Sequence, residues 1–333
     1  MTYDANYFKP RSRDGDPEKD HNETIAFEWS DGLARDVYVF EPRVTLAVNV
    51  AMAAKRPLLI SGEPGSGKTR LAAAVAAVLD WQFYPKTVTS RMQASDLLWT
   101  FNALDRLNDA TSPDRTPLSP QHYVVPENVW WGFSPVTAEN RGHAPLPPDA
   151  RLTNPAPPKK GAGAVVLVDE IDKADPDVPN DLLEPFDVLE FMVKETKDRI
   201  TATRDVFLVL TTNGERELPP AFLRRCVVLA LANPDEKWFE RIAEQHFPKG
   251  DPDLHTRVAA EVQRLRDEAR QSSRKPSTAE FIDALRVCEQ LKLNPASPEW
   301  IEVVNAVLLK KERFAASTTP EAVRPAPGGV PVA

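Results

Sequence analysis

A glycine-rich segment between an apolar run and a helical run constrains this chain more than any other feature. The segment matches the pattern G-x-x-x-x-G-K-[ST] and consists of Gly62, Glu63, Pro64, Gly65, Ser66, Gly67, Lys68 and Thr69. Residues 57–61 before it are mainly apolar, and residues 70–79 after it have the composition of a helix. Glycines let successive backbone N–H groups turn toward phosphate oxygens, and a helix N-terminus adds partial positive charge at the same place. The segment therefore predicts a site for the phosphates of a nucleoside triphosphate.

Two side chains at the end of this segment have predicted roles in that site. Lys68 is expected to reach the β- and γ-phosphates, and the Thr69 hydroxyl is expected to ligate Mg²⁺. The alternative is a glycine-rich turn that merely precedes a helix. The four fixed positions match by chance in roughly one chain of this length in a hundred. Nucleotide binding is therefore the stronger interpretation.

Composition and charge argue against several other classes of protein. The chain has 41 Lys and Arg against 49 Asp and Glu, and its net charge of −8 disfavours binding nucleic acid mainly through the phosphates. Cys226 and Cys288 lie far apart without a partner motif, so neither a disulfide framework nor a zinc site is expected. The first residues contain no apolar signal-peptide core, and no apolar run is long enough to cross a bilayer. We therefore expect a cytoplasmic protein without membrane insertion.

Five apolar runs predict the strands of one sheet. They are residues 57–61, 83–89, 164–168, 206–210 and 227–231. Continuous apolar runs are typical of strands covered on both faces, as in a parallel sheet flanked by helices. The apolar spacing over residues 41–55 adds an amphipathic helix before the first strand. We predict an α/β fold over residues 37–232, with a P-loop and a parallel five-stranded sheet flanked by helices.

Two segments outside the predicted sheet differ in composition from the rest. Residues 1–36 are polar and charged, and we expect a loosely packed N-terminal arm. Residues 106–163 form a Pro-rich insertion between the second and third strands. Within it, Trp130, Trp131 and Phe133 are expected to pack on the protein's own core. A contact with a neighbouring subunit or a client is the alternative.

The C-terminal part of the chain is charged and helical. The apolar spacing predicts helices at residues 236–247, 255–271, 278–291 and 298–310. We expect these helices to form a smaller domain over residues 233–314, joined to the sheet by the Asn-Pro-Asp segment at 233–235. Residues 315–333 are rich in Pro, Ala and Gly and predict a disordered tail.

Two carboxylates follow directly on the strand predicted at residues 164–168. Asp169 and Glu170 would lie at the carboxyl edge of the sheet, beside the phosphates. Asp169 is expected to orient Mg²⁺, and Glu170 to polarise the attacking water as general base. The alternative is an acidic turn after a buried strand, which the glycine-rich segment upstream makes the weaker interpretation. The adjacent Asp–Glu pair also favours hydrolysis over phosphate transfer to a bound acceptor.

Polar residues after the last two predicted strands complete the candidate site. Asn213 follows the strand at 206–210 and is expected to hydrogen-bond the attacking water or the γ-phosphate, with a simple Asn-Gly turn as the alternative. Arg224 and Arg225 precede the last strand. An arginine there would stabilise charge on the γ-phosphate, and more naturally in a neighbouring subunit's site than in its own. The alternative is a solvated basic pair or a local salt bridge.

Taken together, these segments resemble AAA+ ATPases, and in particular the MoxR-like branch, which is related to the dynein and McrB group. The matching segments are residues 47–51, 56–59, 62–69, 169–174, 211–216 and 218–226. The resemblance implies a Walker A motif that ends in Lys68 and Thr69, and a Walker B motif that ends in Asp169 and Glu170. It also implies that Asn213 occupies the sensor 1 position.

The same resemblance implies how the protein would assemble and act. Arg225 would be the arginine finger that reaches a neighbouring subunit's nucleotide, with Arg224 beside it as the second candidate. Residues 190–203 would form a hairpin near the pore of a ring, and the helices after Pro234 would be a lid domain. The cofactors implied are ATP and Mg²⁺. The implied activity is ATP hydrolysis by a hexameric ring that remodels a protein client, with a von Willebrand factor A domain protein as a possible partner.

One segment departs from the family pattern. Related proteins often carry an arginine, the sensor 2 residue, at the start of a lid helix. The comparable segment here, residues 275–280, reads Lys-Pro-Ser-Thr-Ala-Glu and contains no arginine. Arg274, Lys275 and Arg286 are the candidates to replace it.

Two other functions remain open from the sequence. One is a DNA-associated motor of the McrB type, which the negative net charge disfavours. The other is an assembly scaffold in which ATP holds subunits together with little turnover. Phosphate release separates the scaffold from an ATPase, and stimulation by DNA with a steep salt dependence would favour the motor.

Overall fold

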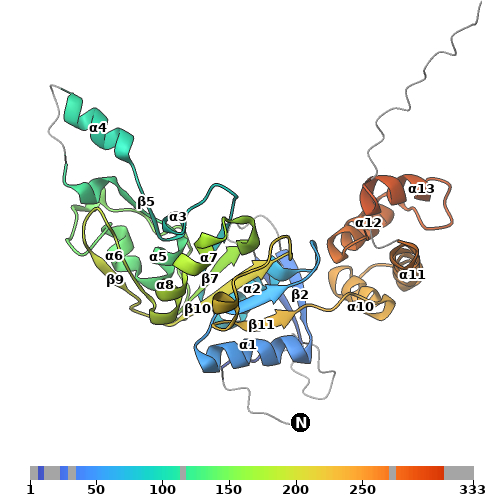
Figure 1. Ribbon diagram of the computed structural model, residues 1–333. Coiled ribbons are helices and arrows are strands. Elements are labelled where there is room, and N and C mark those ends of the chain that lie inside the picture. Colours follow the sequence, from blue (N-terminus) through green and yellow to red (C-terminus); the bar gives the residue numbers. More distant parts are fainter. Residues whose placement is uncertain (1–6, 11–22, 29–34, 113–117, 270–274, 311–333) are drawn as a thin grey trace, which may run out of the picture.

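The computed structural model describes residues 7–10, 23–28, 35–112, 118–269 and 275–310 (Figure 1). The tail that we expected at residues 315–333 and the sensor 2 candidate Arg274 lie outside these ranges.

A parallel sheet of five strands forms the centre of the fold, as the sequence predicted. Its order is β11-β3-β10-β7-β4, and each neighbouring pair is parallel. The strands are β3 (Leu58–Ser61), β4 (Gln82–Thr87), β7 (Ala164–Asp169), β10 (Val206–Thr212) and β11 (Val227–Ala230). In the register of the central strands, Leu210 lies opposite both Leu59 and Val168. The carboxyl ends of β3, β10 and β7 therefore lie side by side at one edge.

Alternate residues of each strand enter two different cores, because successive side chains of a strand point to opposite faces. On one face, Val165, Leu167 and Val209 pack with α1 (Pro42–Ala54) and α2 (Lys68–Leu79). On the other, Val166 and Leu210 pack with the insertion and with helices that follow β7. Both faces are covered, which explains why the strands read as continuous apolar runs.

The insertion packs on the protein's own core, as we expected. Two short elements, α3 (Ser95–Leu98) and β5 (Trp99–Phe101), precede it. The elements that follow are α4 (Ala103–Thr111), η1 (Pro120–Tyr123), β6 (Val124–Pro126), α5 (Asn128–Phe133), α6 (Pro135–Glu139) and η2 (Pro148–Ala150). Trp130, Trp131 and Phe133 are buried, and the Trp130 indole donates to the Thr137 hydroxyl over 2.9 Å. Helix α4 has no buried residue and projects from this end of the molecule (Figure 1).

Helix α5 lies so close to β7 that only glycine fits at one position. A Cβ atom built on Gly132 would lie 2.2 Å from Cγ2 of Val166. We expect Gly132→Ala to destabilise the fold by about 1–3 kcal/mol in urea-induced unfolding, because overpacking outweighs the gain in helix propensity of at most about 1 kcal/mol. Val166→Ala removes the clashing methyl group, so the double variant should be less destabilised than the two single effects added. Additive effects would contradict this explanation.

The short elements after β7 carry several residues of interest. They are η3 (Ile171–Lys173), α7 (Asp177–Asp181), α8 (Leu183–Val188), β8 (Glu190–Met192), β9 (Arg199–Thr201) and α9 (Pro220–Leu223). Strands β8 and β9 pair antiparallel, so the hairpin expected over residues 190–203 is present. Whether it faces a pore stays a prediction.

The described part of residues 1–36 differs from the loosely packed arm that we expected. Phe8 is buried, and its backbone N–H and C=O bond the side chain of Asn49 over 3.0 and 2.8 Å. Strands β1 (Glu23–Glu28) and β2 (Arg35–Phe40) form an antiparallel pair. Phe27 and Phe40 enter the core beside α1 and α2. Phe8 and Phe27 thus anchor a segment whose overall composition is polar.

The C-terminal helices form a core of their own. They are α10 (Glu236–His246), α11 (Pro252–Glu268), α12 (Thr278–Leu291), α13 (Trp300–Val303) and the π-helical turn η4 (Val304–Leu308). Phe239, Val258, Val262, Phe281 and Leu285 are among the residues buried between them. They are drawn in orange to red at one side of the sheet (Figure 1). Within the described residues, no helix is long and apolar enough to cross a membrane.

Candidate active site

The glycine-rich loop (residues 62–69) connects β3 to α2 at the carboxyl edge of the sheet. Gly65 and Gly67 have φ angles of 76° and 93°, a left-handed conformation that favours glycine. The Lys68 ammonium donates to the carbonyl oxygens of Gly62 and Glu63 over 2.7 and 3.0 Å. Its side chain therefore folds back over the loop, next to the space that phosphates would fill.

Lys68 is a buried cation, with 6% of its surface exposed. Burial lowers its pKa, while the negative charges of Asp169, Asp172 and Glu170 act in the opposite direction. Nearby carboxylates and backbone carbonyls thus retain a charge that burial disfavours. An ammonium held in this way suits a polyanionic ligand.

Thr69 and Asp169 lie together at the base of the loop. The Thr69 hydroxyl donates to both carboxylate oxygens of Asp169, over 2.9 and 3.2 Å. The Thr211 hydroxyl, from the strand between β3 and β7, also donates to Asp169. A hydroxyl and a carboxylate beside a phosphate site are the oxygen ligands that Mg²⁺ prefers. The donor set therefore fits the magnesium ion predicted from the sequence.

Glu170 is held by three neighbours in a left-handed backbone conformation, with φ at 60°. Its backbone N–H donates to the Thr211 hydroxyl over 2.8 Å. The Asn213 amide donates to one carboxylate oxygen over 3.0 Å, and the Lys173 ammonium donates to the other over 2.6 Å. The hydrogen bond to Glu170 raises the pKa of Lys173. A left-handed residue other than glycine is uncommon and is often found at functional sites.

Asp172 positions the loop that carries Asn213. One carboxylate oxygen of Asp172 accepts the backbone N–H groups of Asn213 and Glu215, over 3.1 and 2.9 Å. Only 2% of the Asp172 surface is exposed, so this contact is shielded from water. The turn after β7 and the loop after β10 are thereby fixed relative to each other.

One cavity gathers most of the residues that the sequence singled out. Its volume is about 280 Å³, and we refer to it as the loop cavity. Its lining residues are Pro64, Gly65, Gly67, Lys68, Thr69, Arg70, Asp169, Glu170, Asn213 and Ala279. Gly62, Glu63 and Ser66 do not line it. Gly62 and Glu63 hold Lys68 through their carbonyl oxygens instead, and Ser66 lines a neighbouring cavity.

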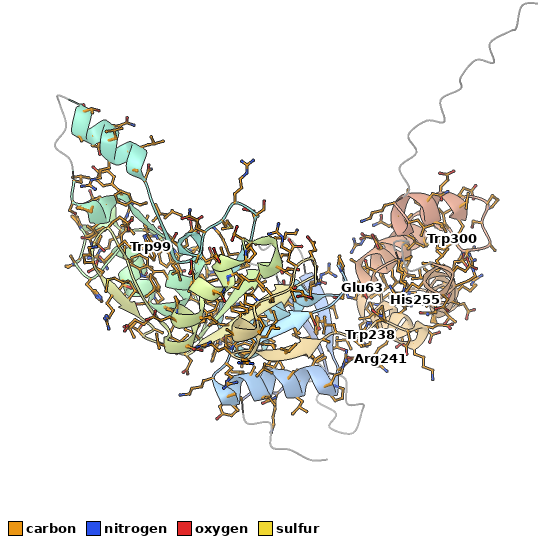
Figure 2. All side chains as sticks on the ribbon, in the orientation of Figure 1. Glu63, Trp99, Trp238, Arg241, His255 and Trp300 are labelled. Carbon is orange, nitrogen blue, oxygen red and sulfur yellow. The ribbon has the colours of Figure 1, made fainter. Side chains whose placement is uncertain are left out.

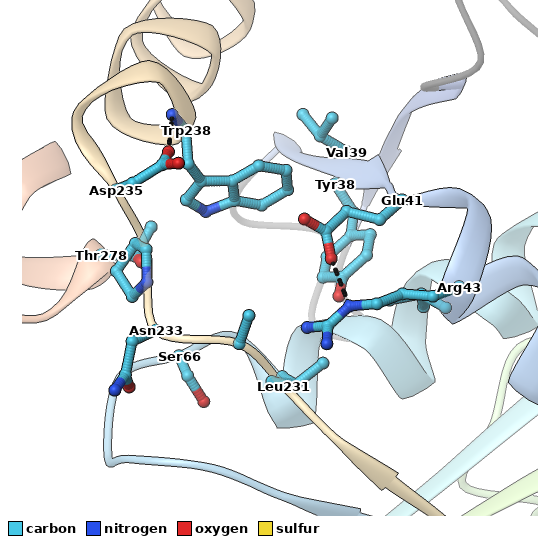
Figure 3. Close-up of a pocket in the computed structure, with 13 residues that line it drawn as sticks. Tyr38, Val39, Glu41, Arg43, Ser66, Leu231, Asn233, Asp235, Trp238 and Thr278 are labelled. Carbon is cyan, nitrogen blue, oxygen red and sulfur yellow. Dashed lines mark hydrogen bonds and ion pairs between the residues drawn. The ribbon is translucent and has the colours of Figure 1, made fainter.

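The neighbouring cavity, of about 130 Å³, was not anticipated from the sequence (Figure 3). Tyr38 of β2 and Trp238 of α10 lie on two sides of it, and we refer to it as the aromatic cavity. Ser66 and Leu231 also line it. Burial raises the pKa of Tyr38, so its phenol stays neutral. Tyr38 lies on β2, a strand that the sequence analysis did not predict, and it belongs to no motif, which is why sequence reasoning missed it.

Neither candidate arginine finger lines the loop cavity of its own chain. Arg225 forms an ion pair with Asp187 at the end of α8, and its side chain is 44% exposed. Arg224 is exposed too, and its backbone carbonyl accepts a hydrogen bond from Arg56 over 3.1 Å. Both side chains are open to a partner, and Arg225 has a defined orientation.

Neither of the described candidates for a sensor 2 residue lines the loop cavity. Lys275 is exposed, and Arg286 pairs with Asp283 on the surface of α12. Ala279 is the residue at the start of α12 that lines the loop cavity. A different arginine, Arg266 of α11, reaches the glycine-rich loop at Glu63. Its spacing of four from Val262 could have placed it on the buried face of its helix.

Comparison with solved structures finds likeness to the RuvB protein of Thermotoga maritima. A RuvB mutant is 15% identical, with a TM-score of 0.47, and the match covers 85% of this chain and 73% of that one. A structure described as the RuvB Holliday junction branch migration motor is 14% identical, with a TM-score of 0.43, and coverage is 79% and 67%. No curated protein sequence matched the chain.

Comparison with protein families matches the segment that carries this site. The model of the AAA domain, dynein-related subfamily, matches residues 57–226, which is more than half of the 333 residues. That range begins just before β3 and ends just before β11, and it contains the glycine-rich loop, Asp169, Glu170 and Asn213. The chain belongs to the AAA domain family, in its dynein-related subfamily.

Proposed function

We propose that this protein binds ATP with Mg²⁺ and hydrolyses it to ADP and phosphate. The observation that carries the proposal is the meeting of Lys68, Thr69, Asp169, Glu170 and Asn213 in one cavity. Membership of the AAA family independently supports a nucleotide-dependent activity. The two cavities border the same glycine-rich loop, at Ser66 and at Gly65, so one elongated ligand can extend across both.

The binding step follows from the charges that line the loop cavity. Lys68 would exchange its bonds to two backbone carbonyls for bonds to phosphate oxygens, which are stronger acceptors. Thr69 and Asp169 would hold Mg²⁺, which when bound neutralises charge on the phosphate oxygens. The adenine ring would enter the aromatic cavity between Tyr38 and Trp238 (Figure 3).

The hydrolytic step is assigned to Glu170 and Asn213. The Glu170 carboxylate would accept a proton from the water that attacks the γ-phosphorus. Asn213 already hydrogen-bonds Glu170 and would orient either that carboxylate or the water. Lys173 neutralises Glu170 in this conformation, so its ion pair has to loosen before the carboxylate acts as a base. As the water attacks, a phosphorus–oxygen bond forms and the bond to the ADP oxygen breaks.

We further propose that the site is completed by a second copy of the chain. Arg225 is exposed and does not line its own loop cavity, which supports a role in a neighbouring site. AAA proteins commonly form rings, and a hexamer is the arrangement that the resemblance to the MoxR-like branch implies. In that assembly, hydrolysis would move the C-terminal helices as a lid and remodel a protein client. A von Willebrand factor A domain partner is part of the same proposal.

A complementation experiment tests hydrolysis at shared sites. We expect Arg225→Ala to lower phosphate release by about 10³-fold, because the arginine stabilises charge on the γ-phosphate. We expect Lys68→Met to be inactive as well, because it cannot hold the nucleotide. Mixing the two should restore part of the activity. A Lys68→Met subunit supplies an intact Arg225 to the nucleotide held by its Arg225→Ala neighbour.

Arg224→Ala is the matched control, because it removes the same charge at the adjacent exposed position. It should retain most of the phosphate release. Failure of the mixture to regain activity, while subunits still exchange, would contradict the shared site. A wild-type protein that assembles yet releases no phosphate would overturn the ATPase proposal and favour the scaffold.

A further inference from the structure

Arg266 is a buried cation on the inner face of α11. It lies four residues after Val262 and eight after Val258, both of which are core residues of the C-terminal helices. Its side chain is 5% exposed. Burying a guanidinium is costly unless it is paired and hydrogen-bonded. The groups that pair with Arg266 therefore have to offset the cost of burying its charge.

Those partners join two parts of the molecule. One nitrogen of Arg266 donates to the Pro276 carbonyl, in the segment that leads into α12. A second nitrogen lies 3.4 Å from a carboxylate oxygen of Glu63, in the glycine-rich loop. Within the described part of the chain, Glu63 is the one carboxylate that pairs with Arg266. Figure 2 shows Glu63 between the sheet and the C-terminal helices.

A second contact joins the C-terminal helices to the glycine-rich loop at Gly65, two residues after Glu63. The backbone N–H of Ala279 donates to the carbonyl of Gly65 over 3.3 Å. A Cβ atom built on Gly65 would lie 2.7 Å from Cβ of Ser277, so the start of α12 fits directly against this glycine. A capping box between Ser277 and Glu280 fixes that helix start. The loop is therefore contacted at both Glu63 and Gly65.

These contacts bear on both cavities. The Glu63 carbonyl accepts a hydrogen bond from Lys68, so the residue that pairs with Arg266 also holds the lysine of the loop cavity. The aromatic cavity is lined by Tyr38 and Ser66 from one side and by Trp238 and Thr278 from the C-terminal helices. A shift of the C-terminal helices would therefore change the shape of the aromatic cavity and the position of Glu63 together.

We propose that the Arg266–Glu63 ion pair couples the position of the C-terminal helices to the glycine-rich loop and strengthens nucleotide binding. Arg266 is in this sense a positioning residue, because it acts through Glu63 and not on the nucleotide itself. This role rests on the proposed nucleotide site. The ion pair gives the C-terminal helices a charged contact with the loop. That contact does not come from the start of α12, where the residue beside the loop cavity is the uncharged Ala279.

The test compares Glu63→Gln, Arg266→Met and the double variant by titration with fluorescent N-methylanthraniloyl-ADP. Each single variant should bind about tenfold more weakly, because either change removes the charged contact between the C-terminal helices and the glycine-rich loop, and Glu63→Gln also leaves the buried Arg266 without its carboxylate partner. The double variant should bind no more weakly than the worse single one, because the two side chains act as one pair. Arg266→Lys, which keeps the charge, should recover most of the affinity. Hydrogen exchange of the α12 amides should rise in the single variants, reporting a loosened contact.

Arg264→Met is the matched control on the same helix. Arg264 is exposed, and among the described residues it pairs within α11, with Glu261 and Glu268. Its replacement should change neither the affinity nor the exchange of α12. If Arg266→Met unfolds, Glu63→Gln still tests the coupling. Glu63 is 44% exposed, and its replacement leaves the Arg266–Pro276 hydrogen bond intact, so this variant should fold.

Two results would overturn the coupling. One is unchanged affinity and unchanged α12 exchange in Glu63→Gln, and the other is single effects that simply add in the double variant. Both are read from ADP binding and hydrogen exchange and do not depend on hydrolysis. A wild-type protein that binds no nucleotide would instead refute the proposed function.

Discussion

Glu170→Gln is expected to lower phosphate release by about 10²–10⁴-fold, the range that a general base contributes. The amide has the size of the carboxylate and can still accept the hydrogen bond from Asn213, but it cannot take a proton from water. The residues that hold the phosphates are unchanged, so nucleotide affinity should stay close to that of the wild type. The measurement is steady-state phosphate release beside a nucleotide titration.

Glu127→Gln provides the matched control for that variant. Glu127 pairs with Lys86 over 2.7 Å, much as Glu170 pairs with Lys173, but it lies outside both cavities. It should keep the wild-type rate. Phosphate release by Glu170→Gln at a rate similar to that of the wild type would refute the role of Glu170 as general base.

An ATP-bound Glu170→Gln assembly is also the form in which to capture a client protein. Recovery of this protein alone would count against client remodelling.

The parts of the site that the sequence predicted are those encoded within one strand and the turn after it. The glycine-rich loop, the Asp169–Glu170 pair and Asn213 each follow directly on an apolar strand. Parallel strands bring such turns to the same edge, so predicting the sheet also predicted that these residues would meet. The order β3-β10-β7 then places Asn213 between the loop and the acidic pair.

The parts that the sequence did not predict depend on contacts between distant segments. Tyr38 and Trp238 line one cavity although they lie far apart in the chain, and neither belongs to a motif. Arg266 and Glu63 are separated by 203 residues. Local periodicity indicates that a side chain is buried, but it does not say which distant segment will cover it. The same limit explains why β1 and Phe8 were assigned to a polar arm.

The Arg225–Asp187 ion pair is a second contact between distant segments that the sequence did not predict. The Arg-Arg sequence before β11 predicted an arginine that acts on a neighbouring subunit, with a local salt bridge as the alternative. In the structure Arg225 has the salt bridge, and its side chain is still 44% exposed. The two interpretations therefore do not exclude each other, because Asp187 can orient an arginine that a second chain reaches. The complementation experiment tests whether Arg225 also acts on the nucleotide of a second chain.

Lys68→Met should weaken nucleotide binding by about 2–5 kcal/mol, which is about 30-fold or more in the dissociation constant. Methionine fills the space of the alkyl chain, but it leaves the phosphates without the ammonium and Glu63 and Gly62 without their donor. Lys86→Met is the control, because it removes a lysine of similar pairing outside both cavities. Equal affinities in Lys68→Met and the wild type would refute phosphate binding by the glycine-rich loop.

The pH dependence of binding gives the same assignment a second, independent check. Burial lowers the pKa of Lys68, so in the free protein its charge is present at low pH and is lost at a lower pH than that of an exposed lysine. The contribution of the ammonium to nucleotide affinity is therefore complete below that pKa and declines as the pH rises above it, because binding then has to recharge the lysine. We expect wild-type affinity for N-methylanthraniloyl-ADP to decline on the alkaline side and this decline to be absent in Lys68→Met. An identical alkaline decline in both proteins would assign the titration to another group, since methionine carries no proton to lose.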